Sequence, residues 1–117
     1  MRLKDKVTIV TGAASGFGEG IARLYAAEGA KVAVADINAA GAKSVAASIG
    51  ANAIAVTCDV TKRADIDALV QATRDAFGGR IDVVVNNAGW THRNRPLLEV
   101  DEATFDKVYA VNVKSIF

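Results

Sequence analysis

The chain has 117 residues, enough for one domain, and 51% of them are hydrophobic, so a buried core is available. Its net charge of +1 arises from Lys and Arg interspersed with Asp and Glu, which argues against a nucleic-acid partner. No apolar run approaches the roughly 20 residues that cross a bilayer, and Cys58 is the single cysteine, so we expect a soluble cytoplasmic protein with Cys58 in its core.

In the first half of the chain, short apolar runs alternate with helical patterns. Residues 7–10 form a β-branched run that predicts a buried strand. Residues 17–28 carry apolar side chains at helical spacing, and Gly29 suits the position just after a helix. Residues 31–35 predict a second buried strand, and Asn38 can cap a helix over residues 39–49.

The second half repeats this alternation. Residues 53–57 predict a third strand. Thr61 is expected to cap the next helix, which Gly78-Gly79 ends. Residues 81–85 predict a fourth strand, and a last helix is expected to begin near Asp101.

Buried strands joined by helices predict an α/β fold with a parallel sheet, and right-handed crossovers make it doubly wound and Rossmann-like. The pattern comprises four strands and the start of the following helix, and it stops inside that helix. An open sheet of this type usually continues with further strands. We therefore expect residues 1–117 to be the N-terminal part of a larger domain that continues past Phe117.

A glycine-rich stretch, TGAASGFG at residues 11–18, lies between the first strand and the first helix. Gly12 permits a tight turn, while the missing side chains of Gly16 and Gly18 let a diphosphate reach the backbone and let the helix pack closely. Ser15 can add a hydroxyl donor beside the positive end of the helix dipole. A turn that merely needs glycines is the alternative, because the spacing is neither G-x-G-x-x-G nor that of a P-loop.

Two acidic residues follow the second and third strands. Asp36 stands where a carboxylate accepts hydrogen bonds from an adenosine ribose, and Ile37 and Asn38 supply no basic group for a 2′-phosphate, so NAD is favoured over NADP. Asp59 can hydrogen-bond an adenine amino group, with Val60 against the ring. Each acid can instead cap the helix that follows it.

The fourth predicted strand is followed by Asn86-Asn87-Ala88-Gly89. Ligands bind at this end of the strands in open α/β sheets, so the tetrapeptide is a candidate for a cofactor site. A purely structural role is equally open, because asparagine side chains can hydrogen-bond the backbone of neighbouring loops.

The last helix carries an amide on its apolar face. Asn112 lies in the middle of a face formed by Phe105, Val108, Tyr109 and Ile116. A buried amide costs about 2–7 kcal/mol unless it is hydrogen-bonded. We therefore expect Asn112 to have a partner, either in the core or in a functional site.

Together these pieces resemble one family, the short-chain dehydrogenases/reductases, in its single-domain branch. The matching pieces are TGAASGFG, Asp36, the Asp59-Val60 pair, NNAG at residues 86–89, and Asn112, in order over essentially the whole chain. The resemblance implies that Asn112 is a catalytic residue that holds a water in a proton relay. It implies cofactor binding by Gly12, Ser15, Gly16, Phe17, Gly18, Asp36, Ile37, Asp59, Val60, Asn86, Ala88 and Gly89.

The resemblance also implies a function. The protein is expected to be an NAD-dependent oxidoreductase that transfers a hydride between nicotinamide and a small-molecule carbonyl or secondary alcohol, with residues 1–117 as the N-terminal part of its dinucleotide-binding domain. Neither Tyr25 nor Tyr109 is followed four residues later by lysine, so the family's catalytic Ser, Tyr and Lys would fall beyond Phe117 and the chain alone should be inactive. The helix bearing Phe105 and Tyr109 resembles one used in oligomer packing, which implies a dimer or tetramer.

Two other functional classes are considered. A non-catalytic NAD(P)-binding regulator or redox sensor would share this fold, whereas a nucleotide-binding methyltransferase has no use for NNAG or Asn112. One histidine, His92, gives no basis for a metal site. The stretch from Trp90 to Pro96 can border the substrate opening, where Arg93 and Arg95 would favour an acidic substrate unless they are solvated surface charges.

Overall fold

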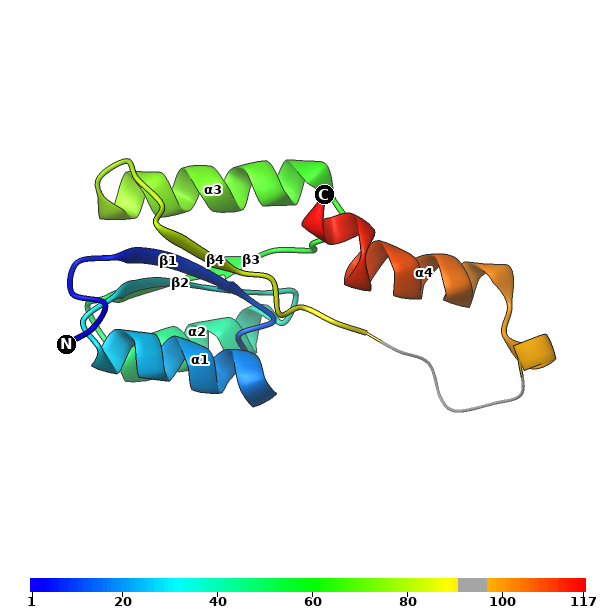
Figure 1. Cartoon of the computed structure of the whole chain (residues 1–117), viewed down its shortest axis with the longest axis horizontal. Coiled ribbons are helices and arrows are strands. Elements are labelled where there is room, and N and C mark those ends of the chain that lie inside the picture. Colours follow the sequence, from blue (N-terminus) through cyan, green and yellow to red (C-terminus); the bar gives the residue numbers. More distant parts are fainter. Residues whose placement is uncertain (91–96) are drawn as a thin grey trace.

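We describe residues 1–90 and 97–117 of a computed structural model of the chain. The elements follow the alternation expected from the sequence, with helices between successive strands and a last helix after the fourth strand (Figure 1). They are β1 (Val7–Thr11), α1 (Gly16–Ala27), β2 (Lys31–Asp36), α2 (Ala39–Ile49), β3 (Ala53–Thr57), α3 (Arg63–Phe77), β4 (Val83–Val85), the 3₁₀ turn η1 (Leu97–Glu99), α4 (Glu102–Asn112) and the 3₁₀ turn η2 (Lys114–Ile116).

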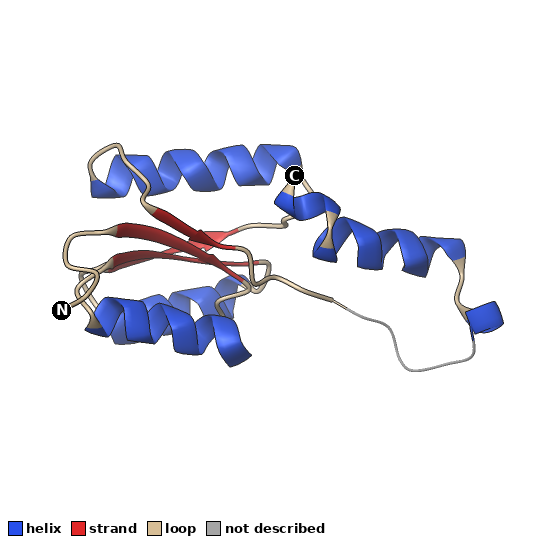
Figure 2. Cartoon of the chain, viewed as in Figure 1, coloured by secondary structure: helices blue, strands red, loops and turns tan. Residues whose placement is uncertain are grey.

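The strands form one parallel sheet in the order β3-β2-β1-β4. The chain starts on β1, winds outward through β2 to β3, and returns to the other side of β1 as β4. Helices α1 and α2 cover one face of the sheet and α3 covers the other (Figure 2). This confirms the predicted doubly wound, Rossmann-like α/β fold and places the carboxyl ends of all four strands along one edge.

Side chains that alternate along the strands divide the core into two layers. Val10, Val32 and Val34 pack beneath α1 and α2, together with alanines of both helices. Ile9, Ala33 and Ala35 face the opposite side, where Leu69 of α3 and Cys58 complete the layer. Cys58 is 2% exposed, which confirms it as a core residue.

The helix ends follow the expected signals with one exception. The Asn38 side chain accepts a hydrogen bond from the Gly41 N–H at the start of α2, and Gly29 and Gly78 have the positive φ expected just after a helix. The predicted cap at Thr61 is wrong, because α3 begins at Arg63 with Lys62 as its N-cap.

The fourth strand is shorter than predicted. β4 begins at Val83, not at residue 81, because the Asp82 carboxylate takes the place of a ladder acceptor. The Asp82 side chain accepts a hydrogen bond from the Val7 N–H at 2.8 Å and is paired with Arg80 at 3.1 Å. The hydrogen bond from Val7 and the charge of Arg80 lower the pKa of Asp82.

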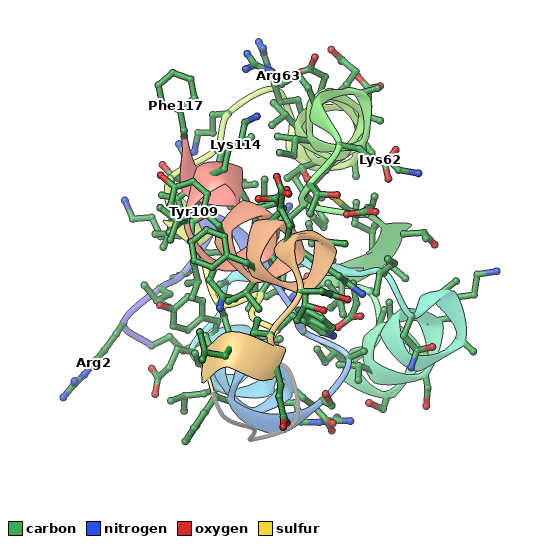
Figure 3. The ribbon with its side chains drawn as sticks, turned by 90° about the vertical axis from the view of Figure 1, so that its right-hand side faces the viewer. Arg2, Lys62, Arg63, Tyr109, Lys114 and Phe117 are labelled. Atoms are coloured by element: carbon green, nitrogen blue, oxygen red, sulfur yellow. The ribbon has the colours of Figure 1, made fainter. Side chains whose placement is uncertain are left out.

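Helix α4 lies beyond the carboxyl ends of the strands (Figure 1). No residue of α4 is buried, and Phe105 and Tyr109 are 64% and 54% exposed, so the apolar face identified on this helix is not covered by the described residues. In an end-on view, Phe117 projects away from the ribbon (Figure 3). In residues 1–90 and 97–117, no helix is both long and apolar enough to cross a bilayer.

Candidate active site at the carboxyl edge of the sheet

A cavity of about 820 Å³ runs along the carboxyl edge of the sheet. Loops that follow all four strands contribute to it, and α4 closes part of its border. Because parallel strands end at the same edge, residues far apart in the sequence meet here. The lining residues are Gly12, Ser15, Phe17, Asp36, Ile37, Cys58, Asp59, Val60, Thr61, Asn87, Ala88, Gly89, Trp90, Lys107 and Val111.

The three glycines of the loop after β1 have different structural roles. Gly12 has a φ of +64°, and a Cβ there would lie 3.0 Å from the Ala88 Cα. A Cβ on Gly18 would overlap the Gly12 carbonyl oxygen and lie 2.6 Å from Asn87 Nδ2, so this position allows α1 to pack against the loop. Gly16, with a φ of +57°, has no atom within 4 Å of its Cβ position and faces open space at the start of α1.

The start of α1 borders the cavity and is free of side-chain capping. The N-cap residue, Ser15, is extended and its hydroxyl makes no capping hydrogen bond. Ser15 and Phe17 are exposed, Phe17 by 88%. The first N–H groups of a helix have no intrahelical partner and carry a partial positive charge, which suits an anion. Glu19 in the first turn carries the opposite charge, but it is paired with Arg23 at 2.8 Å.

The Asp36 carboxylate holds two loops together. Its Oδ2 accepts a hydrogen bond from the Ala14 N–H at 3.0 Å, and its Oδ1 accepts one from the Asn38 N–H at 2.9 Å. The alternative role as a helix cap is not observed, since Asn38 caps α2. The next residue, Ile37, is 67% exposed at the cavity border.

Asp59 is kept charged by its neighbours. Its Oδ1 accepts hydrogen bonds from both the hydroxyl and the N–H of Thr61, at 2.6 and 2.9 Å. These two hydrogen bonds, aided by the positive charges of Lys62 and Lys107, lower the pKa of Asp59. Residues 59–62 form a turn in which the Lys62 N–H donates to the Asp59 carbonyl at 3.0 Å, so α3 begins only at Arg63, after the predicted cap at Thr61.

Cys58 lines the cavity between these acids without being accessible. Burial, followed by the negative charges of Asp65 and Asp59, raises the pKa of its thiol from 9.0 to about 11. The thiol therefore stays protonated at neutral pH and contributes an apolar wall.

The loop after β4 is attached to the glycine loop through Asn87 and Thr11. Asn87 Nδ2 donates to the carbonyl oxygens of Thr11 and Gly12, at 3.2 and 3.3 Å. The Thr11 hydroxyl donates to the Val85 carbonyl at 3.3 Å and accepts from the N–H groups of Asn87 and Ala88 at 3.0 Å. The structural role that the sequence left open for the asparagines of NNAG is therefore the one that Asn87 has, whereas the hydroxyl of Thr11 was not singled out from the sequence.

Asn86 lies outside the cavity. Its side chain is exposed and borders a separate hollow of about 100 Å³, next to Val84 and Ser115. Gly16, Gly18 and Asn112 do not line the cavity either. The predicted site residues that line it together are Gly12, Ser15, Phe17, Asp36, Ile37, Asp59, Val60, Ala88 and Gly89.

Asn112 has the partner that its amide requires, but it is exposed and not buried. Its Oδ1 accepts from the Trp90 N–H and its Nδ2 donates to the Trp90 carbonyl, both at 2.8 Å. The α-helix ends at Asn112, and the chain passes through Val113, with φ −122° and ψ −62°, into η2. The helix is thus interrupted just after Asn112.

Trp90 is also held by its ring. The Lys107 Nζ lies 4.0 Å from the ring centroid, a cation–π distance. Lys107 was not identified from the sequence, because its spacing marks only an exposed helix position. His92, Arg93 and Arg95 lie outside the described residues. Within residues 1–90 and 97–117, no group of three or more His, Cys, Asp or Glu side chains could hold a metal ion.

Comparison with known proteins places these features in context. A family model described as short chain dehydrogenase matches residues 6–117. The chain is 51% identical over 120 residues to a 4-formylbenzenesulfonate dehydrogenase of Comamonas testosteroni, covering all of this chain (100%) and 47% of that protein. It is 48% identical over 114 residues to a galactitol 2-dehydrogenase of Agrobacterium fabrum, covering 97% and 44% of the two chains.

A solved structure is similar in both sequence and fold. It is a 3-ketoacyl-(acyl-carrier-protein) reductase from Brucella melitensis complexed with NADH. The TM-score is 0.95 at 46% identity, and the match covers 97% of this chain and 47% of that one. The chain therefore spans about half the length of the relatives it matches.

Proposed function

The chain belongs to the short-chain dehydrogenase family, and on that premise we propose that it is the dinucleotide-binding part of an NAD(H)-dependent oxidoreductase. The reaction of the complete protein would be hydride transfer between nicotinamide and a carbonyl or secondary alcohol carbon of a small molecule. Relatives named as dehydrogenases and a similar structure that holds NADH support this proposal.

The observation that carries the proposal is the arrangement of charge in one cavity. At one side lies the uncapped start of α1 beside the open space at Gly16, which suits a diphosphate. At the other side lie the carboxylates of Asp36 and Asp59, which suit an adenosine ribose and an adenine amino group. In this arrangement Val60 and Ile37 would flank the adenine, and Ala88 and Gly89 would form the floor of the site.

The same arrangement favours NAD over NADP. A 2′-phosphate at the position of the ribose hydroxyl would lie against the Asp36 carboxylate, and the next two residues, Ile37 and Asn38, carry no positive charge. Two unit charges 4 Å apart repel by about 4 kcal/mol at the effective dielectric constant of a protein surface. Solvent screening reduces this value, and we expect NADH to bind at least tenfold more tightly than NADPH.

In the complete protein, Asn112 would belong to the catalytic group. The interruption of the helix after Asn112 supports this role, because it frees backbone groups next to the cavity that can hold a water. The acid–base residues would come from the rest of the protein, so this chain alone would bind the cofactor without turnover. Cytoplasmic location and a homo-oligomer are part of the same proposal, the latter supported by the exposed Phe105 and Tyr109 of α4.

A direct binding experiment tests the proposal. Trp90 is the only tryptophan of the chain and lines the cavity, so its fluorescence should be quenched when NADH binds. Titrations with NADH and NADPH should give a lower Kd for NADH, and Asp36→Ala should reduce the difference. Asp75→Ala, which removes an exposed acid of α3 outside the cavity, is the matched control and should leave both Kd values unchanged. Equal or tighter binding of NADPH by the wild type would contradict the assignment.

A further inference from the structure

Both carboxylate oxygens of Asp36 accept hydrogen bonds from the protein before any ligand is bound. Each of its two oxygens accepts one backbone N–H, from Ala14 at 3.0 Å and from Asn38 at 2.9 Å. Ala14 belongs to the glycine loop, and Asn38 is the N-cap of α2. The carboxylate therefore joins two segments that follow different strands.

The surroundings of this junction are closely packed. The neighbouring residue of the glycine loop, Ala13, donates its N–H to the Ala35 carbonyl at 3.1 Å, which continues the pairing of β1 with β2. In the first turn of α2, a Cβ on Gly41 would lie 2.9 Å from the Ala14 Cβ and 2.7 Å from Asn38 Nδ2. Because Gly41 has no side chain, α2 can start directly against the glycine loop, with the Asp36 carboxylate between them.

We propose that Asp36 is a positioning residue for the glycine loop in addition to its proposed role as a ribose acceptor. An ionised carboxylate has about four acceptor positions, of which the two N–H groups occupy one on each oxygen. One acceptor position on each oxygen is left for the ribose hydroxyls. Asp36 thus fixes the loop around Ala14 in its binding conformation before the dinucleotide arrives. The ribose part of this inference rests on the proposed function, whereas the loop-positioning part does not.

The two roles make different predictions for a ligand without ribose hydroxyls. If Asp36 only binds the ribose, Asp36→Ala should not weaken binding of an NADH analogue whose adenosine ribose lacks both hydroxyls. Removal of the negative charge should even strengthen it, because the diphosphate is an anion. If Asp36 also positions the glycine loop, Asp36→Ala should weaken binding of this analogue at least fivefold. An unchanged or lower Kd would overturn the positioning role.

Amide hydrogen exchange tests the positioning role without any cofactor. In the ligand-free chain, Asp36→Ala should raise the exchange rates of the Ala14 and Asn38 amides at least tenfold, while Val34 in β2 stays protected and shows that the fold is intact. Asp59→Ala is the matched control, because Asp59 accepts its hydrogen bonds from Thr61, and it should leave Ala14 unchanged.

A conservative variant separates this role from general destabilisation. Asp36→Asn keeps one carbonyl oxygen and replaces the other oxygen by a donor, so it can accept from only one of the two amides. We expect one of the pair, Ala14 or Asn38, to remain protected and the other to exchange rapidly. Protection of both amides in Asp36→Ala would overturn the positioning role. Failure to bind NADH with this exchange pattern intact would instead refute the proposed function alone.

Discussion

Substitution by alanine should lower the stability of the chain at Gly18 and raise it at Gly20, although both glycines lie in the same turn of α1. Gly18 and Gly20 both lie in α1, and both have negative φ, so alanine fits the backbone at either position. A Cβ at position 18 would overlap the Gly12 carbonyl oxygen, lie 2.8 Å from the Gly12 carbonyl carbon and lie 2.6 Å from Asn87 Nδ2. A Cβ at position 20 would meet nothing within 4 Å.

The magnitudes follow from these surroundings. Replacing glycine by alanine inside a helix stabilises it by about 0.5–1 kcal/mol when the site is open, which is the expectation for Gly20→Ala. Overpacking costs about 1–3 kcal/mol, and at Gly18 two of the opposing atoms are backbone atoms of Gly12 that cannot rotate away. Contact with backbone atoms selects the upper part of this range, about 2–3 kcal/mol, so after the helix gain is subtracted Gly18→Ala should lower the free energy of unfolding by about 1–2.5 kcal/mol.

Urea unfolding followed by circular dichroism measures both effects. With an m-value of about 1.5 kcal/mol/M, the midpoint should fall by about 1 M for Gly18→Ala and rise by about 0.5 M for Gly20→Ala. Comparison of the two variants cancels the common helix-propensity effect and leaves the steric effect at position 18. If Gly18→Ala is as stable as the wild type, α1 does not pack on the glycine loop as described.

Three further predictions concern side chains around the cavity. Asn87→Ala should lose about 1–3 kcal/mol of stability because the Thr11 and Gly12 carbonyls lose the donor that Asn87 supplies. Asn86→Ala should change stability by less than about 0.5 kcal/mol, and equal losses of the two variants in urea unfolding would contradict the structural role of Asn87. Because the pKa of Cys58 is raised from 9.0 to about 11, the protonated thiol should stabilise the folded chain fully below pH 9, and this contribution should disappear as the pH rises towards 11. A thiol reagent at about pH 8 should react with Cys58 roughly 100-fold more slowly than with an unperturbed thiol, and rapid labelling of the folded chain would refute this. Thr61→Val should raise the pKa of Asp59 in an NMR titration, because the hydrogen bond from the Thr61 hydroxyl is the largest cause of the lowered pKa. As the pH is lowered, the variant should therefore lose the stability contributed by ionised Asp59 at a higher pH than the wild type does. An unchanged pKa would contradict that cause.

The elements that could be predicted are those with local signals. Short apolar runs identified all four strands, and helical spacing identified the helices α1 to α4. The capping chemistry of Asn38 and the positive φ of Gly29 and Gly78 agree with the observed helix ends. The parallel, doubly wound arrangement of the strands followed from the helices between them and from right-handed crossovers. These features depend on residues close in sequence or on general rules of chain topology.

The features that were missed depend on competition or on contacts between distant segments. Thr61 is not the helix cap because it lies inside a turn closed by the hydrogen bond from the Lys62 N–H to the Asp59 carbonyl, and α3 begins after that turn. The amphipathic pattern of α4 identifies an apolar face without revealing what covers it, and in the described structure Phe105 and Tyr109 are exposed. The pairing of Lys107 with the Trp90 ring joins two elements whose proximity only the tertiary structure reveals.

A crystal structure of this chain with NAD tests the central claim most directly. We predict the diphosphate at the start of α1 beside Gly16, the adenosine ribose hydroxyls on the Asp36 carboxylate, and the adenine between Ile37 and Val60 with its amino group at Asp59. The hydrogen bonds of Asp36 to Ala14 and Asn38 should persist in the complex. A dinucleotide bound elsewhere on the chain, or bound here with the ribose away from Asp36, would contradict the proposed site.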